Sequence, residues 1–76
     1  MNKTRRRKIQ LIINALQDNL NHLEDLKQEE EESFNNLPES LQESERGEAM
    51  ENAISNLDDA VTYLGEVIDY LESAME

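Results

Sequence analysis

The feature that most constrains this chain is the regular spacing of apolar residues in its C-terminal half. Through residues 50–75 they recur with alternating gaps of 4 and 3, which is the period of a heptad repeat. This repeat places them on one side of an α-helix, where other helices must cover them. The residues at heptad positions a and d, which we expect to form an oligomer core, are Met50, Ile54, Leu57, Val61, Leu64, Ile68, Leu71 and Met75.

We predict a second helix over residues 44–75 with a stripe wider than a two-stranded seam requires. Position g is also small or apolar, and three such positions in every heptad are typical of helices in bundles. The residues at g are Ala53, Ala60, Val67 and Ala74. Gly65 lies at position e and costs about 1 kcal/mol relative to Ala inside a helix. It either permits a close helix contact or is simply tolerated.

A similar stripe predicts a first helix over residues 9–33. Its seam residues, again with gaps of 4 and 3, are Ile9, Ile13, Leu16, Leu20 and Leu23. Ile12 and Leu26 flank this stripe, and Asn19 lies beside it, where a polar residue either helps to set the register of a coiled coil or is simply a surface residue. The next seam position holds Lys27, so we expect the seam to end there or to open to solvent.

Residues 34–43 are predicted to form the bend between the two helices. Leu37 precedes Pro38, which disfavours helical geometry at Leu37 and suits the first turn of a new helix at Pro38. We expect a short helical turn over residues 38–42, and Ser40 or Ser44 as the cap of the next helix. The apolar side chains expected to close this end of the bundle are Phe34, Leu37 and Leu41.

Together these elements predict an all-α fold, in which residues 1–76 form one antiparallel helical hairpin. A chain of 76 residues without Cys has no disulfide to supplement a small core. We therefore expect two hairpins to associate as a homodimer and to bury their remaining apolar surface in a four-helix bundle. Ile or Val at a with Leu at d also suits a parallel contact between second helices. The relative direction of the two hairpins stays open.

Charge is distributed unevenly along the chain, whose net charge is -11. Five of the seven basic residues lie in residues 1–8, the basic arm: Lys3, Arg5, Arg6, Arg7 and Lys8. We expect the arm to run into the first helix with Thr4 as a cap and a frayed first turn, because cations oppose the helix dipole there. The arm either contacts nucleic-acid phosphates or neutralises the acidic C-terminal end of its own hairpin, at Asp69, Glu72 and Glu76.

The acidic residues are the leading candidates for contact with a partner. Excess carboxylates repel nucleic acid and attract basic surfaces, and regular negative charge on a rod imitates a nucleic-acid backbone. The alternative is that they only keep a small bundle soluble. Tyr63 and Tyr70, both at position c, either pack half-buried against a neighbouring helix or anchor a partner. The acids assigned to partner binding are Glu29, Glu30, Glu31, Glu32, Glu39, Glu43, Glu45, Glu48 and Glu51.

The residue content argues against catalysis and cofactor binding. The chain has no Cys and a single His, His22, and it has no Gly-rich phosphate loop. We therefore expect a non-enzymatic protein without a cofactor, a metal or a small-molecule ligand. No apolar run approaches the roughly 18 residues of a membrane span, and the N-terminal segment lacks the apolar core of a signal peptide. We expect no membrane contact and a cytoplasmic location.

The bend and the start of the second helix carry a resemblance to known sequences. Residues 34–57, F-N-N-L-P-E-S-L-Q-E-S-E-R-G-E-A-M-E-N-A-I-S-N-L, resemble a group of small uncharacterised acidic helical proteins of low-GC Gram-positive bacteria and their phages. The group has no assigned activity, so the resemblance implies no functional residues. It implies a phage or mobile-element context, in which small acidic proteins often bind and inhibit a host protein.

Overall fold

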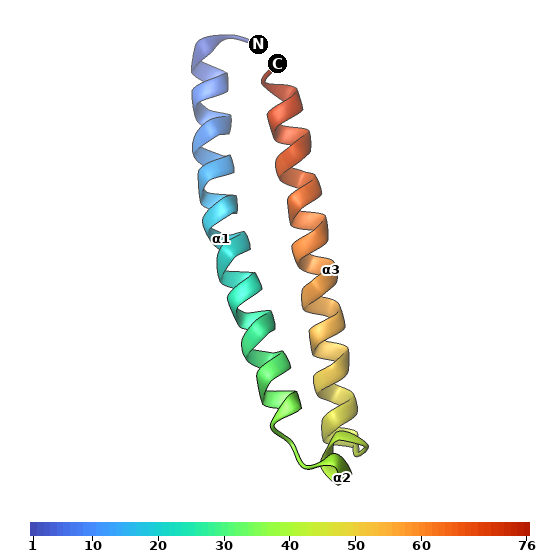
Figure 1. Ribbon diagram of the computed structural model, residues 1–76. Coiled ribbons are helices and arrows are strands. Elements are labelled where there is room, and N and C mark those ends of the chain that lie inside the picture. The colour runs from blue at the N-terminus through green and yellow to red at the C-terminus, as the bar shows by residue number, and fades with distance from the viewer.

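The chain folds into a hairpin of two long helices, as a computed structural model describes for all 76 residues (Figure 1). Helix α1 spans Lys3–Asn35, the short helix α2 spans Glu39–Gln42, and α3 spans Glu45–Ala74. The long helices run antiparallel and form a rod of 58 × 15 × 12 Å, with both chain ends at one end and α2 at the other (Figure 1). The predicted all-α helical hairpin is therefore confirmed.

The contact between α1 and α3 follows the predicted heptad stripes. All eight predicted seam residues of α3, and all five of α1, are buried or half-buried, whereas most residues between them are exposed. The most covered seam residues are Ile13 of α1 and Ile68 of α3, with 1% and 4% of their surface exposed. Both lie in the half of the hairpin that carries the chain ends. A single layer of side chains thus joins the helices, and Gly47 is the only other buried residue.

Helix α1 begins and ends at residues other than the predicted 9 and 33. The helix begins at Lys3, so residues 3–8 of the basic arm are helical, and it ends at Asn35 rather than residue 33. The cap is Asn2 and not Thr4, since the Asn2 side-chain oxygen accepts a hydrogen bond from the Arg5 N–H at 2.8 Å. Asn is among the strongest N-cap residues, and this bond satisfies one free N–H of the first turn despite the unfavourable cations there.

The bend is held mainly by polar contacts to the backbone. Gln42 donates from its side-chain nitrogen to the carbonyls of Phe34 and Leu37, both at 3.1 Å, and so ties α2 to the end of α1 and to the bend. Ser44, rather than Ser40, caps α3 and accepts a hydrogen bond from the Gly47 N–H. Phe34 and Leu37 are half-buried as expected, but Leu41 remains 40% exposed, so its predicted place in the end of the core is wrong.

Gly47 allows α2 to fold back onto the start of α3. It lies seven residues before Ile54 and so occupies position a of the same stripe. A Cβ built at Gly47 would lie 2.1 Å from the backbone oxygen of Gln42, which no side chain tolerates. At Gly65, by contrast, nothing lies within 4 Å of the corresponding position. Within the hairpin Gly65 is therefore tolerated rather than required for a close helix contact.

The two glycines form a matched pair for testing this arrangement. Gly47→Ala should lower the free energy of unfolding by about 1–3 kcal/mol, because α2 must move away from α3 and release the Gln42 contacts. Gly65→Ala should raise it by up to about 1 kcal/mol, because Ala is the better helix former. Urea unfolding followed by circular dichroism, at one protein concentration, measures both. Equal stabilisation by both substitutions would contradict the tight packing at Gly47.

Candidate functional site

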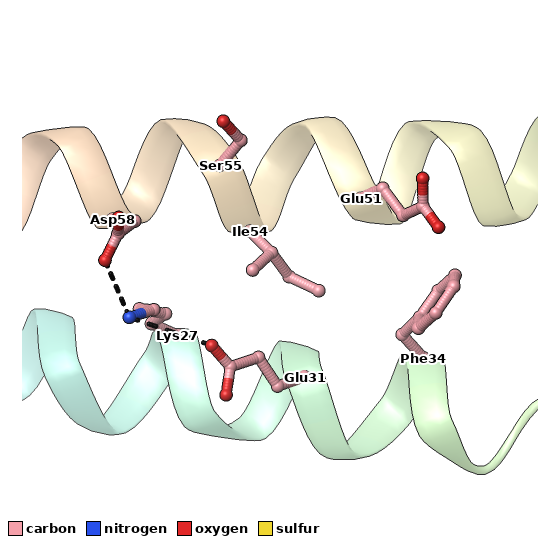
Figure 2. A pocket seen from close by; sticks show the side chains of 7 residues that line it. All are labelled: Lys27, Glu31, Phe34, Glu51, Ile54, Ser55 and Asp58. Atoms are coloured by element: carbon pink, nitrogen blue, oxygen red, sulfur yellow. Dashed lines mark hydrogen bonds and ion pairs between the residues drawn. The ribbon is translucent and has the colours of Figure 1, made fainter.

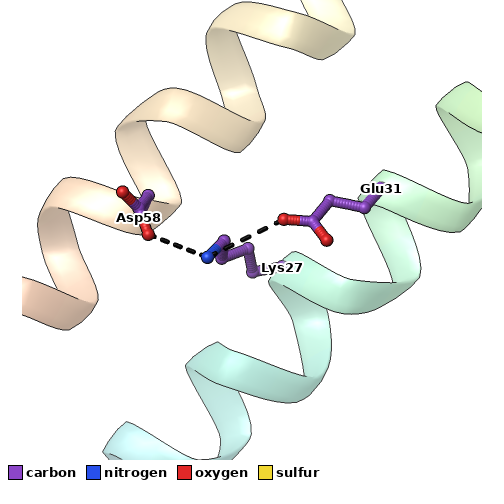
Figure 3. Close-up of polar contacts among 3 residues, drawn as sticks. All are labelled: Lys27, Glu31 and Asp58. Atoms are coloured by element: carbon purple, nitrogen blue, oxygen red, sulfur yellow. Dashed lines mark hydrogen bonds and ion pairs between the residues drawn. The ribbon is translucent and has the colours of Figure 1, made fainter.

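Lys27 forms the central polar contact of the hairpin. Its side-chain nitrogen lies 2.8 Å from a carboxylate oxygen of Asp58 on α3 and 3.7 Å from one of Glu31, a turn further along α1 (Figure 3). The sequence predicts that the seam ends at Lys27 or opens to solvent there. It does not end, since Phe34, one heptad further on, is again half-buried, but it does open, since Lys27 lines a solvent-exposed hollow. The aliphatic stem of Lys27 takes a seam position while its amine reaches the edge of the interface.

The same contact alters the protonation of Lys27. The hydrogen bond to Asp58 raises the pKa of the Lys27 amine above its ordinary value of 10.5, and the charges of Asp58 and Glu31 act in the same direction. Partial desolvation opposes this shift, because it disfavours the charged form. The amine therefore stays positively charged throughout the neutral range.

Beside this contact lies an open hollow of about 390 Å³ between α1 and the first half of α3 (Figure 2). The Phe34 ring and the Ile54 side chain line its apolar part, and the carboxylates of Glu31 and Glu51 approach it from opposite helices (Figure 2). Lys27, Ser55 and Asp58 complete the lining. An apolar floor with carboxylates at the rim suits a Lys or Arg side chain, which has an aliphatic stem and a charged head.

The predicted acidic residues lie around this hollow and the adjoining bend. Glu30 and Glu31 are half-covered, and the other seven assigned acids are exposed. Glu31 and Glu51 are far apart in the sequence, but both line the same hollow. The remaining acids spread over the outer faces of the three helices rather than converging on one point. These carboxylates form an extended surface and not an enclosed acid–base pair.

Both tyrosines lie apart from the bend hollow. Tyr63 and Tyr70 expose 65% and 77% of their surface, so neither is half-buried against α1, and that alternative is excluded within the hairpin. Tyr70 borders a separate hollow of about 310 Å³ with Glu66, Asp69 and Ser73. Along α3, Tyr70 is about 28 Å from Glu51 at 1.5 Å per residue. The acidic hollow and the tyrosines are therefore two different surfaces.

The basic arm is exposed on the first turns of α1. Arg6 donates from its side chain to the backbone carbonyl of Met75 at 3.1 Å, which joins the two ends of the chain. None of the five arm cations forms an ion pair, since both ion pairs of the hairpin involve Lys27. The expected neutralisation of Asp69, Glu72 and Glu76 by the arm is therefore not seen as direct pairing. The arm's charges remain available at the end of the rod.

Sequence reasoning missed the residues whose roles depend on contact between helices. Lys27 and Glu31 have the spacing of a pair on one helix, which was visible in the sequence. The stronger contact, with Asp58, depends on the register between α1 and α3, which no single-helix pattern specifies. Gln42 was missed for a similar reason, since its role lies in reaching two carbonyls across the bend.

No helix is long and apolar enough to cross a membrane. No group of three or more His, Cys, Asp or Glu side chains is arranged to hold a metal ion. The chain matches no protein-family model, no curated protein and no solved structure.

The raised pKa of Lys27 predicts a loss of stability at alkaline pH. A group whose pKa is higher in the folded state contributes its full stabilisation below its ordinary pKa, here 10.5, and loses it as the pH rises through the folded value. The melting temperature of the wild-type protein should therefore fall more steeply above about pH 10 than that of Lys27→Met.

Lys3→Met is the control for this experiment, because Lys3 is exposed and forms no ion pair in the hairpin. Both variants lose one lysine and keep both tyrosines, and only Lys27→Met removes the ion pair with Asp58 and Glu31. Lys3→Met should retain the alkaline loss of the wild type. The assignment fails if Lys27→Met and Lys3→Met show the same pH dependence. Thermal unfolding by circular dichroism at several pH values provides the measurement.

Proposed function

We propose that this chain is a non-enzymatic interaction protein whose acidic outer surface binds a basic surface of another protein. The observation that carries the proposal is the lack of compensation for its carboxylates. Only Glu31 and Asp58, of 18 acidic residues, form an ion pair. The rest, of which only Glu30 is half-covered, are exposed on a rod 58 Å long and create a negative field that attracts cationic partners.

The bend end is the proposed contact region. There the acids are most concentrated, and the hollow beside Lys27 combines the Phe34 ring and Ile54 with carboxylates from both long helices. A Lys or Arg side chain of the partner would place its stem on the apolar floor and its charge between Glu31 and Glu51. A basic groove that normally holds a nucleic-acid backbone fits this description, so the mechanism we propose is inhibition by nucleic-acid mimicry.

The proposal includes self-association of the hairpin as a homodimer in a four-helix bundle. It is supported by the small core of one chain, in which Ile13 and Ile68 are the only buried apolar residues. A single layer of contacts is little compensation for the entropy of ordering 76 residues. The resemblance at residues 34–57 adds a phage or mobile-element context, in which the expected partner is a bacterial host protein.

Removing charge from the bend tests the acidic surface. Replacement of the four acids Glu29–Glu32 by Gln should slow association with a partner captured from host lysate by about tenfold at low salt, because exposed charges act mainly on the association rate. Dissociation should change less. Stopped-flow or surface-plasmon-resonance kinetics at several salt concentrations measure both rates, with sedimentation confirming that the variant keeps the mass of the wild type.

A charge-matched control removes four acids elsewhere. Asp18→Asn, Asp25→Asn, Glu72→Gln and Glu76→Gln change the net charge by the same amount but leave the bend intact. This control should slow association much less than the bend variant does. Equal effects of the two variants would mean that only net charge matters. An unchanged association rate of the bend variant at low salt would show that the acidic surface is not the binding site.

A second candidate function is contact with nucleic acid through the basic arm. It is supported by the exposure of all five arm cations and by their lack of ion pairs. The arm is helical, so five Gln substitutions at Lys3, Arg5, Arg6, Arg7 and Lys8 remove its charge more cleanly than a deletion. A purely structural bundle without a separate ligand is the remaining alternative.

The arm variant separates these functions. If the arm binds phosphates, the Gln substitutions should abolish binding of the protein to fluorescent duplex DNA and remove its salt dependence. The bend variant should then bind DNA more tightly, because its repulsive charge is reduced. If the acidic surface is the functional one, the arm variant should keep its affinity for the captured protein partner. Loss of that affinity together with DNA binding would favour the arm.

A further inference from the structure

One long face of the hairpin carries no charge. On α3, heptad positions c and g hold no Asp, Glu, Lys or Arg from residue 49 to residue 74, and on α1 the corresponding positions hold none from residue 9 to residue 28. We call these two rows the uncharged face. Its larger side chains are Ile12 and Leu26 from α1 and Tyr63, Val67 and Tyr70 from α3.

The two rows lie on the same side of the rod. In an antiparallel pair of helices, e positions of both helices flank one edge of the seam and g positions flank the other. The ion pair of Lys27 with Glu31 and Asp58, both at e, marks the first edge. The g positions of both helices therefore share the opposite edge. Five of the eight large apolar side chains that are exposed lie there: Ile12, Leu26, Tyr63, Val67 and Tyr70, at 44–77% exposure.

We propose that a second copy of this chain covers the uncharged face, with the two hairpins antiparallel. This inference rests on the homodimer proposed above and specifies its face and direction. Two copies of net charge -11 repel each other, and the uncharged face is the one along which they meet without opposing carboxylates. The uncharged rows extend about 38 Å along α3, from 25 residues at 1.5 Å each, and cover roughly 600 Å² at the 15 Å width of the rod. Contact along the full 58 Å, with the charged ends included, covers roughly 900 Å², against ~800 Å² per partner for a stable interface.

Charge at the two ends of the rod selects the antiparallel direction. The basic arm lies at one end and the glutamate run Glu29–Glu32 at the other. A parallel dimer brings like ends together, whereas an antiparallel dimer stacks α1 on α1 and places each basic arm beside the partner's glutamates. Lys8 and Glu29 are both at position c and exposed, so they border the uncharged face and meet across this dimer.

The rows themselves have the required symmetry. On α1, Ile12 and Leu26 are each seven residues from Asn19, so a two-fold axis at Asn19 places Ile12 of one copy opposite Leu26 of the partner subunit. The same axis places Lys8 of one copy opposite residue 30 of the partner subunit, which is next to Glu29. On α3 the g positions run from Ala53 to Ala74 and are centred beside Leu64, which lies at about the height of Asn19. The Asn19 side chains of the two copies then meet at the axis, where polar pairs fix register.

Spin labels at single introduced cysteines measure the direction. For Asn35→Cys, at the exposed end of α1, the antiparallel dimer separates the two labels by about 48 Å, from 32 residues at 1.5 Å each. A parallel dimer brings them below about 30 Å, since bundle helices lie ~10 Å apart. For Asn21→Cys, near the axis, the labels are within about 30 Å in either direction, so this variant controls for dimer formation.

A charge swap tests the contact between ends. Glu29→Lys should raise the dimer dissociation constant about tenfold at low salt, because a favourable pair becomes repulsive at each of two sites. Glu32→Lys makes the same change of charge at position f, off the uncharged face, and should have little effect. Adding Lys8→Glu to Glu29→Lys should restore the dimer. Within one chain Lys8 and Glu29 are about 32 Å apart on α1, so this rescue requires two copies.

The outcomes separate this inference from the proposed function. A short distance at Asn35, or no rescue by the charge swap, overturns the antiparallel direction. A monomer at about 100 µM in sedimentation, with no dipolar coupling at Asn21, overturns the dimer as well. Neither result affects binding of a basic partner by the other bend acids, which lie off the uncharged face. Because Glu29 borders that face, the bend variant is compared with the wild type at a concentration at which sedimentation gives both the same mass. Loss of that binding in a protein that keeps the long Asn35 distance overturns the proposed function alone.

Discussion

The single layer of side chains between α1 and α3 is the contact on which the rest of the structure depends. Each helix contributes one residue to it every three or four positions, and Ile13 and Ile68 are the only apolar residues that become buried. Most of the remaining side chains lie at the surface, and the function we propose depends on how charge and apolar side chains are distributed over it.

That distribution has two components with different physical consequences. Carboxylates on the outer faces act over distance, within the Debye length of about 8 Å at physiological salt, and so govern how fast cationic partners arrive. The uncharged face acts only on contact, through burial of Tyr, Val, Ile and Leu side chains. The two surfaces adjoin at Glu29, which borders the uncharged face, whereas Glu31, Glu32 and Glu51 lie off it. A dimer that covers the uncharged face therefore leaves these acids exposed for a partner.

Much of this architecture was predictable because the second stripe has eight seam residues and the first has five, all at the same alternating spacing, so each reinforces the period. Single residues were less predictable. Asn2 and Thr4 are both good caps, and only the observed start of α1 decides between them. Leu41 was expected in the core from its apolar side chain, but the hydrogen bonds from Gln42 to Phe34 and Leu37 set the orientation of α2.

The candidate site was predictable only in part. The acidic surface followed from composition. The hollow shared by Glu31 and Glu51 depends on the register between α1 and α3, which the contact of Lys27 with Asp58 shows.

The position of both chain ends at the same end of the rod has a mechanical consequence. A force applied between the two termini pulls α1 and α3 apart in an unzipping geometry, so that it loads the seam one layer at a time. The bond from Arg6 to the Met75 carbonyl breaks first, and the packing of Gln42 against Gly47 bears load last. Resistance to such a force is limited by a single layer of contacts, and it does not grow with the length of the hairpin.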